Sequence, residues 1–305
     1  MKVFVTGAGG FVGRSVVARL AAEGHAVRAL VRPPSARALF RAESVETVEG
    51  DVADRAGLTA AARGAEAAIH LVGILRERGA DTFEAVHVAG TENVAAACRA
   101  AGARRLVYVS ALGVGRGPDV PYLASKAAAE EHVRGSGLDW TILRPSIIHG
   151  PRGDFMVAMA RMVARPGPVP LVGSGRQTIQ PVWVEDVARV CAGALVREGT
   201  IGRTYDVGGP EVMHLATFYR TLARVLLRRA KWCVPVPTVL VRLGARVAVR
   251  LLKDPPVTPD ELAMLLAARP CDIRPMCEAF DLEPTALETA LALYAGELKT
   301  AAGLA

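Results

Sequence analysis

The sequence predicts an α/β fold, in which a doubly wound parallel sheet carries a smaller, mainly helical C-terminal lobe. Three observations predict this fold. Short β-branched runs alternate with helical periodicity, a glycine-rich turn joins the first run to the first helix, and the C-terminal part is helical in pattern. We expect a sheet domain over residues 1–210, in which 150–185 contributes to a cleft, and a helical lobe over 211–305.

Composition limits the classes of protein. Hydrophobic residues are 51% and charged residues 22%, as in globular proteins. The net charge of +7 raises the question of a nucleic-acid partner, but aromatic residues are only 5%, so we expect a solvated basic surface and no nucleic acid. The five cysteines form no Cys-x-x-Cys pair, which favours reduced thiols in the cytoplasm. The six histidines show no metal-ligand spacing, so no metal site is expected.

The N-terminal stretch carries the strongest signal, because a β run at 2–5, a glycine turn and a helical pattern follow one another. Gly7 permits a tight turn, Gly10 lets the backbone approach a pyrophosphate, and Gly13 lets the helix pack closely on the sheet. Unpaired amides at the helix start attract phosphate. The order therefore predicts a Rossmann-type dinucleotide site. We expect cofactor contacts along the turn, at Gly7, Gly9, Gly10, Phe11, Val12, Gly13 and Arg14.

A second strand, expected at Val27–Val31, ends at Arg32. The residue at this position faces the adenosine ribose, where an acidic side chain binds the 2′-hydroxyl of NAD and a basic one accepts the 2′-phosphate of NADP. Arg32 and Arg14 therefore favour NADP(H) over NAD(H) as the cofactor. The alternative is that Arg32 is only a solvated residue at a strand end.

The alternation continues with strands expected at Val45–Val52, Ala67–Gly73 and Arg105–Ser110, and with an alanine-rich helix over 82–102. His70, near a strand end, is expected to be packed or hydrogen-bonded rather than catalytic. Further cofactor contacts are expected at the ends of these strands, at Asp51, Val52, Leu71, Val72, Gly73 and Ser110.

Tyr122 and Lys126 are four residues apart, so they share a helix face and the ammonium can lie near the phenol. A nearby cation lowers a tyrosine pKa and makes the phenol a usable acid or base, while the lysine can also hold the nicotinamide ribose. We expect both to contact the cofactor and, with Ser110, to be the catalytic candidates.

The later chain is less regular. A sixth strand is expected at Trp140–Pro151, with Pro145 among the cofactor contacts, and 165–170 and 173–175 are expected to be loops. A short strand and a helix begin near Gln180, and Thr204–Pro210 has the pattern of a final strand and turn.

A basic amphipathic helix is expected in the C-terminal lobe, because Arg242, Arg246 and Arg250 recur every four residues among leucines and valines. Two interpretations stay open. The helix rests on an anionic membrane or an acidic partner subunit, or it packs its apolar face on the sheet domain.

The chain resembles extended, atypical short-chain dehydrogenases/reductases, and most of all the nucleotide-binding accessory subunit of respiratory complex I (the alpha-subcomplex subunit-nine family) with its bacterial relatives. The resemblance rests on the glycine turn and on Leu71–Leu75, Val109–Gly113, Tyr122–Lys126, Leu143–Ser146 and Gln180–Val182. It implies tightly held NADPH and, in the respiratory setting, a structural rather than a turnover role. We expect respiratory-complex subunits or a membrane surface as partners through the basic C-terminal lobe, which would place the protein in the cytoplasm or at the inner face of the membrane.

The chain departs from active members of that family at two places. They carry a serine or threonine one position beyond Ser110, where this chain has Ala111, followed by Leu112. They also carry an asparagine where His87 stands. The loss of a group that polarises a carbonyl costs about 3 kcal/mol of transition-state stabilisation.

Two main functions follow. The first is an NADPH-binding protein with a structural or redox-sensing role, and the second is an active NADPH-dependent reductase or epimerase on a nucleotide-sugar, quinone or other carbonyl substrate. A regulator that reads the NADP redox state through the same pocket is a weaker third.

Overall fold

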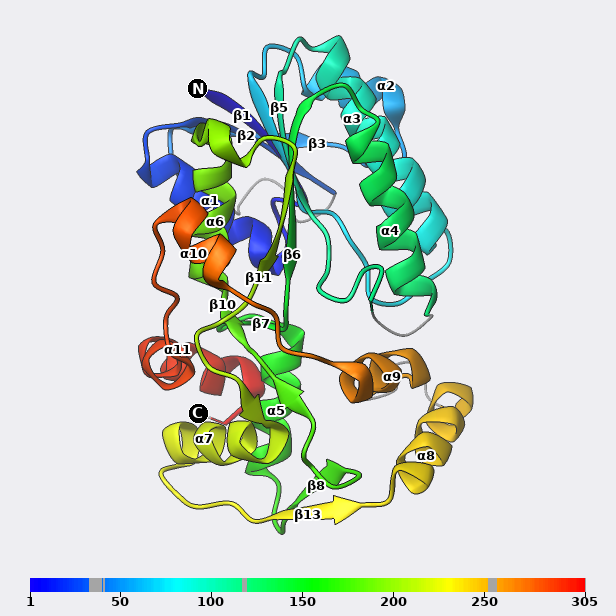
Figure 1. The fold of residues 1–305 in the computed structure, drawn as a ribbon, viewed down its shortest axis with the longest axis vertical. Coiled ribbons are helices and arrows are strands. Elements are labelled where there is room, and N and C mark those ends of the chain that lie inside the picture. Colours follow the sequence, from blue (N-terminus) through cyan, green and yellow to red (C-terminus); the bar gives the residue numbers. More distant parts are fainter. Residues whose placement is uncertain (33–39, 41, 117–119, 252–256, 305) are drawn as a thin grey trace. The chain divides into compact units, whose positions relative to one another are not determined.

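The computed structural model describes residues 1–32, 40, 42–116, 120–251 and 257–304 (Figure 1). Two compact units are present, each built from three segments. Unit 1 comprises Met1–Pro145, Val184–Val207 and Arg274–Leu282. Unit 2 comprises Ser146–Trp183, Gly208–Ile273 and Glu283–Ala305. The domain boundary expected at residue 210 would divide the chain into two continuous halves, and it stays a prediction. The compact units described here each consist of several separate segments.

Unit 1 contains one parallel sheet and its helices. Its elements are β1 (Lys2–Thr6), α1 (Phe11–Ala22), β2 (Ala26–Val31), β3 (Val45–Glu49), α2 (Arg55–Ala61), β4 (Ala67–His70), the π-helical turn η1 (Glu84–Ala89), α3 (Gly90–Ala100), β5 (Arg105–Val109), α4 (Pro121–Arg134), β6 (Asp139–Pro145), α6 (Val184–Val196), the 3₁₀ turn η2 (Glu198–Thr200), β11 (Arg203–Val207) and α10 (Arg274–Phe280).

The seven strands run in the order β11-β6-β5-β4-β1-β2-β3, and every neighbouring pair is parallel. Every residue of β4 and β5 is buried. Continuous apolar strands of this kind are typical of a parallel sheet covered on both faces. The predicted α/β fold class, a Rossmann-type sheet with a helical C-terminal region, is confirmed.

Helices cover both faces of the sheet in unit 1. The helices α2, α3 and α4 lie on one face and α1 and α6 on the other (Figure 1). Leu58 of α2, Val94 of α3 and Ala129 of α4 share a core with Phe4 and Leu106 of the sheet. On α1 the buried residues Gly13, Val16, Val17 and Leu20 follow the i, i+3, i+4, i+7 spacing of one helix face, so α1 packs against the sheet from its first turn.

Unit 2 is mainly helical. Its elements are β7 (Ile148–His149), α5 (Asp154–Ala164), β8 (Val169–Val172), β9 (Thr178–Ile179), β10 (Val182–Trp183), β12 (Met213–His214), α7 (Leu215–Leu227), β13 (Cys233–Val236), α8 (Thr238–Leu251), α9 (Pro259–Ala267) and α11 (Leu287–Ala302). The core of unit 2 lies among α5, α7 and α11, where Met156, Phe218, Leu222, Leu291 and Leu298 are buried together.

Some local expectations are wrong. Residues 165–170 are not all loop, because Val169 begins β8, which pairs in parallel with β13. Thr204–Pro210 does not hold the final strand, since β12 and β13 follow it. A proline lies inside each of β8 and β13. When only the neighbouring residues are considered, proline favours a loop, but a strand in a two-stranded pair can accommodate it.

Candidate functional site

The glycine turn after β1 is tight enough to require glycine. Gly7 has φ +73°, and a Cβ placed there would lie 3.0 Å from the backbone of Leu71 and Val72. A Cβ on Gly13 would lie 2.1 Å from the carbonyl oxygen of Gly7. The structure therefore brings the turn against the residues that follow β4. The cofactor contacts expected at Gly7, Leu71 and Val72 stay a prediction.

The turn leads into a helix start suited to an anion. Gly10 caps α1 without a side-chain hydrogen bond, and the first turn, which holds Phe11, Val12 and Gly13, has no acidic residue. The Gly10 amide donates to the Gly7 carbonyl (3.0 Å) and the Arg14 amide to the Gly10 carbonyl (3.1 Å). Since the peptide dipoles of α1 point their positive end at this turn, the backbone fits a diphosphate.

Arg14 and Arg32 have separate partners. The Nε of Arg14 donates to the carbonyl oxygen of Gly9 (3.0 Å), which holds the side chain on the turn. Arg32 Nη1 donates to both carboxylate oxygens of Asp81 (2.9 and 3.1 Å) and lies 3.7 Å from Asp51. The hydrogen bond that Arg32 donates to Asp81 raises the pKa of Arg32. A 2′-phosphate at Arg32 would therefore share the guanidinium with carboxylates.

The expected adenine contacts lie at the end of β3. Asp51 accepts a hydrogen bond from the Ala53 amide (2.9 Å), which shapes the turn before α2. Val52 is buried, and its carbonyl oxygen accepts from Asn93 Nδ2 (3.0 Å). These contacts fix the backbone beside Asp51 and Val52, while their contact with adenine stays a prediction.

Tyr122 and Lys126 lie on α4, as predicted, but no hydrogen bond joins them in the described part of the chain. Lys126 is buried, and its Nζ donates to the Tyr108 hydroxyl (3.2 Å) and to the Val109 carbonyl (3.1 Å). A Cβ on Gly73 would lie 3.2 Å from that Nζ. Lys126 is therefore placed at the end of β4, where the sequence predicts a cofactor contact.

The expected lowering of the Tyr122 pKa is wrong for this structure. Burial raises the pKa of Tyr122 to about 12. Burial also lowers the pKa of Lys126 to about 8, against the opposing charge of Glu130. Tyr122 is thus a protonated phenol at neutral pH, because burial disfavours the charged phenolate.

His87 lies in η1 and connects the Tyr122 region to the loop after β4. Its Nε2 accepts from the Ile74 amide (2.9 Å), so its Nδ1 carries the proton and donates to Ser125 Oγ (2.8 Å). The Tyr122 ring packs edge-on against His87 and Phe83. Burial, with the Lys126 charge nearby, lowers the pKa of His87 to about 3, so this imidazole is neutral.

A chain of buried polar groups lies behind Lys126. The imidazole of His70 is 2.6 Å from Thr6 Oγ1 and 3.0 Å from Thr91 Oγ1, and it stacks on the Tyr108 ring. This confirms that His70 is packed and hydrogen-bonded. Burial lowers its pKa to about 3.

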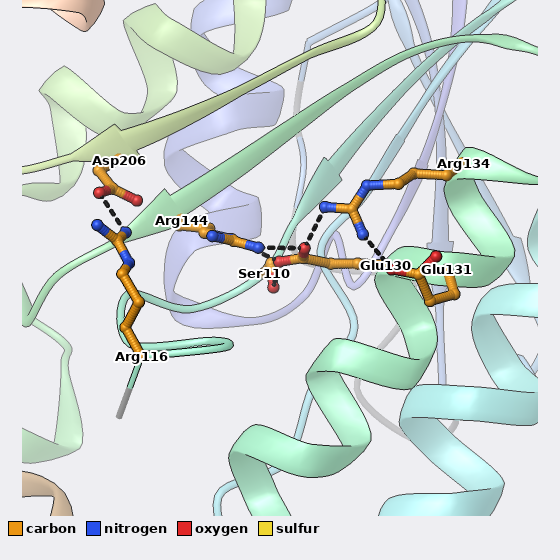
Figure 2. A network of polar contacts seen from close by, with 7 residues as sticks. All are labelled: Ser110, Arg116, Glu130, Glu131, Arg134, Arg144 and Asp206. Carbon is orange, nitrogen blue, oxygen red and sulfur yellow. Dashed lines mark hydrogen bonds and ion pairs between the residues drawn. The ribbon is translucent and has the colours of Figure 1, made fainter. Parts of the chain in front are cut away.

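Ser110 is held in a network of ion pairs and hydrogen bonds (Figure 2). Its hydroxyl donates to Glu130 Oε1 (2.6 Å). The same carboxylate accepts two hydrogen bonds from Arg144 (2.8 and 2.6 Å) and one from Arg134 (2.7 Å). Desolvation alone would raise the pKa of Glu130, but the hydrogen bonds lower it. The catalytic role of Ser110 stays a prediction, and its hydroxyl is already engaged.

Next to Ser110, Ala111 is buried and supplies no hydroxyl, and the Leu112 amide donates to the carbonyl of Pro145 (2.9 Å). The Glu130 network and the surroundings of Tyr122 include residues that the sequence analysis did not single out. Glu130 is four residues beyond Lys126 and four before Arg134, and this spacing is a signal for it. For Tyr108 and Phe83 no local signal exists, because both have the pattern of core residues.

Two further findings concern the described residues. No helix among them is long and apolar enough to cross a bilayer. In the same part of the chain, His, Cys, Asp and Glu side chains do not gather in groups of three or more that could hold a metal ion.

The chain is similar to known proteins. The profile of a family described as NAD(P)H-binding matches residues 7–197. Ceramide reductase of Caulobacter vibrioides is 38% identical over 187 residues, which cover 61% of this chain and 58% of that protein. A (4-alkanoyl-5-oxo-2,5-dihydrofuran-3-yl)methyl phosphate reductase of Streptomyces griseus is 34% identical, with 84% of this chain and 83% of that protein covered.

The mitochondrial NADH dehydrogenase 1 alpha subcomplex subunit 9 of Arabidopsis thaliana is 32% identical. The aligned region covers 68% of this chain and 54% of that subunit. The chain thus spans less than two thirds of this subunit and of the ceramide reductase. Among solved structures, gox2253 superposes with a TM-score of 0.79 at 26% identity, over 99% of this chain and 98% of that one. A UDP-glucuronic acid 4-epimerase from Bacillus cereus with bound NAD, at 18% identity and a TM-score of 0.75 over 98% of this chain and 99% of that one, shares the fold.

Proposed function

This chain belongs to the NAD(P)H-binding, atypical short-chain dehydrogenase/reductase family, and we propose that it holds NADPH as a structural or redox-sensing component. The observation that carries the proposal is the glycine turn. Gly7 and Gly13 stand where no Cβ fits, and the uncapped start of α1 points its amides at the space that a diphosphate would fill.

The remaining cofactor contacts follow from the same geometry. Arg32, with Arg14 on the turn, would hold the 2′-phosphate, while Lys126 and Tyr122 would hold the nicotinamide ribose. Lys126 fits this role because its buried ammonium lies beside Gly73, and its hydrogen-bond acceptors among the described residues are the neutral oxygens of Tyr108 and Val109. When bound, NADPH supplies a hydride at its nicotinamide ring.

The residues around Tyr122 support binding more than fast turnover. Ala111 has no hydroxyl to polarise a carbonyl, and the Ser110 hydroxyl is occupied by Glu130. Burial raises the pKa of Tyr122 to about 12, so the phenolate, which is the form that accepts a proton, is rarer at neutral pH than for an ordinary tyrosine. The diphosphate and the 2′-phosphate would be held by other residues, on the glycine turn and at Arg32, so these departures leave that part of cofactor binding intact.

The proposal is tested by titrating NADPH into the purified protein and a Gly10→Ala variant. Gly10 has φ −72°, and an added Cβ would lie 3.2 Å from the Gly7 carbonyl, so the turn can accept the methyl group while the diphosphate cannot approach it. We expect the affinity to fall about tenfold or more, which is about 1.4 kcal/mol.

Gly199→Ala is the matched control, since a Cβ there meets nothing within 4 Å. Binding of NADPH that is equal in all three proteins, or absent in the unchanged protein, would contradict the proposal. Circular dichroism establishes that each variant is folded.

A second candidate is an NADPH-dependent carbonyl reductase. Two observations favour it. A phenol with a pKa of about 12 is in the protonated form needed to donate a proton to a carbonyl oxygen as hydride arrives. Two of the relatives reported above are named reductases. Lys126 would orient the ribose beside Tyr122, and the missing hydroxyl at Ala111 would keep the rate low.

The change Tyr122→Phe separates the two candidates. If the protein is a reductase, the rate of NADPH oxidation with carbonyl substrates falls about 100-fold while the dissociation constant for NADPH changes little. If it is a binder, no substrate-dependent oxidation is measured in either protein.

The partners also belong to this proposal. The 32% sequence identity with the NADH dehydrogenase subunit supports a place in a respiratory assembly, at the inner face of a membrane. This position is proposed for the chain as a whole.

A further inference from the structure

The helix α8 in unit 2 exposes apolar side chains instead of burying them. It follows β13 and contacts α9 (Figure 1). Among its residues only Ala245 is buried, whereas Leu240, Leu243, Val247 and Leu251 are 45–78% exposed. These apolar side chains are therefore not packed within unit 2. The interpretation in which they pack on the sheet domain stays a prediction.

The leucines and the arginines of α8 lie on different faces, while the exposed Val239 and Val249 lie on the arginine side. At 100° per residue, Leu240, Leu243, Val247 and Leu251 form one stripe along the helix. The exposed Arg242, Arg246 and Arg250 form a second stripe, about 100° away around the axis. Ala245 lies roughly opposite the leucines. The helix α8 therefore packs on unit 2 through the face that holds Ala245, and its exposed side carries an apolar stripe flanked by a basic one.

The segment around α8 has one sign of charge. Between Val212 and Leu251 there is no acidic residue, and eight basic residues are present, namely Arg220, Arg224, Arg228, Arg229, Lys231, Arg242, Arg246 and Arg250. Trp232, which precedes β13, is 82% exposed. It borders a cavity of about 660 Å³ that Arg220, Arg224 and Lys231 also line.

We propose that this surface of unit 2, made of α8 and Trp232 and called here the α8 surface, docks on a bilayer that contains anionic phospholipid. The inference names the lipid class behind the proposed peripheral position and rests on that part of the proposed function. The leucine stripe enters the boundary between acyl chains and headgroups, the arginine stripe lies against lipid phosphates, and Trp232 sits at headgroup depth.

Charge complementarity favours a bilayer over a second copy of the chain. Two such basic surfaces repel each other, whereas anionic headgroups attract each arginine and leave the apolar stripe free to enter the membrane. An acidic protein would match the charge but not the continuous apolar stripe.

The test is co-sedimentation of the full chain with vesicles of phosphatidylcholine alone and with vesicles of phosphatidylcholine and phosphatidylglycerol in equal parts. We expect binding to the anionic vesicles only, and a blue shift of tryptophan emission that Trp232→Phe removes. Replacing Arg242, Arg246 and Arg250 by Gln should weaken binding on the order of 100-fold. Leu243→Ser should weaken it as well.

The matched control replaces Arg55, Arg63 and Arg99 of unit 1 by Gln, since these arginines are exposed and the change in charge is the same. Three outcomes would overturn the inference: equal loss in this control, equal binding to both kinds of vesicle, or self-association that Leu243→Ser abolishes while vesicles stay unbound. An NADPH titration of the same variants is expected to be unchanged. It separates failure of the lipid inference from failure of the cofactor proposal.

Discussion

Replacing Glu130 by Gln removes the charge at the centre of the network in Figure 2 and keeps the shape of the side chain. Glu130 is 0% exposed and accepts four hydrogen bonds, two from Arg144 and one each from Arg134 and Ser110. The variant leaves the Arg144 guanidinium, whose side chain is 16% exposed, without its charged partner.

Breaking a buried ion pair from one side costs about 3–5 kcal/mol, because the remaining charge stays desolvated. Most of this cost falls on Arg144, since the Arg134 side chain is 31% exposed and water can compensate it in part. At roughly 3 °C per kcal/mol for a domain of this size, the unfolding midpoint should fall by about 10 °C.

The assay is thermal and urea unfolding followed by circular dichroism. Glu131→Gln is the control on the same helix, because Glu131 is 74% exposed and pairs with Arg134 alone in the recorded ion pairs of the described residues. It should change the free energy of unfolding by less than about 1 kcal/mol. Equal effects of the two changes would refute the reasoning that burial, rather than the number of ion pairs, decides the cost.

Two other predictions concern cofactor preference and pH. Asp81→Asn removes a carboxylate that competes for Arg32, so the affinity for NADPH should rise about threefold while the affinity for NADH stays unchanged. Arg32→Asp should shift the preference towards NADH. If neither variant changes the selectivity, Arg32 is not part of the 2′-phosphate site. Burial lowers the pKa of His70 and His87 to about 3, below the unfolded value of about 6.5, so the unfolded chain binds protons first as the pH falls. Stability is then complete above about pH 6.5 and falls by about 1.4 kcal/mol per pH unit for each histidine below it. Urea unfolding at pH 7 and pH 5 measures this loss, and equal midpoints would contradict it.

The sequence alone predicts what depends on neighbouring residues. Gly7, Gly10 and Gly13 predict the turn because the backbone of a strand–turn–helix unit restricts each of those positions. The β-branched runs predict the parallel strands, and the spacing of Tyr122 and Lys126 predicts their common helix. These features lie within one turn or one strand, where local geometry decides the structure.

Only the tertiary structure decides which groups pair across the chain. Arg32 meets Asp81, Ser110 meets Glu130, and the Lys126 ammonium turns to Tyr108, although these partners lie many residues apart or on other elements. Burial beside Phe83 and His87, which lie far from Tyr122 in sequence, likewise raises the pKa of Tyr122, where local spacing predicts a lower value. Hydrogen-bond partners and desolvation depend on contacts between segments that are far apart in the sequence. The periodic pattern of apolar residues does not indicate which segments come into contact.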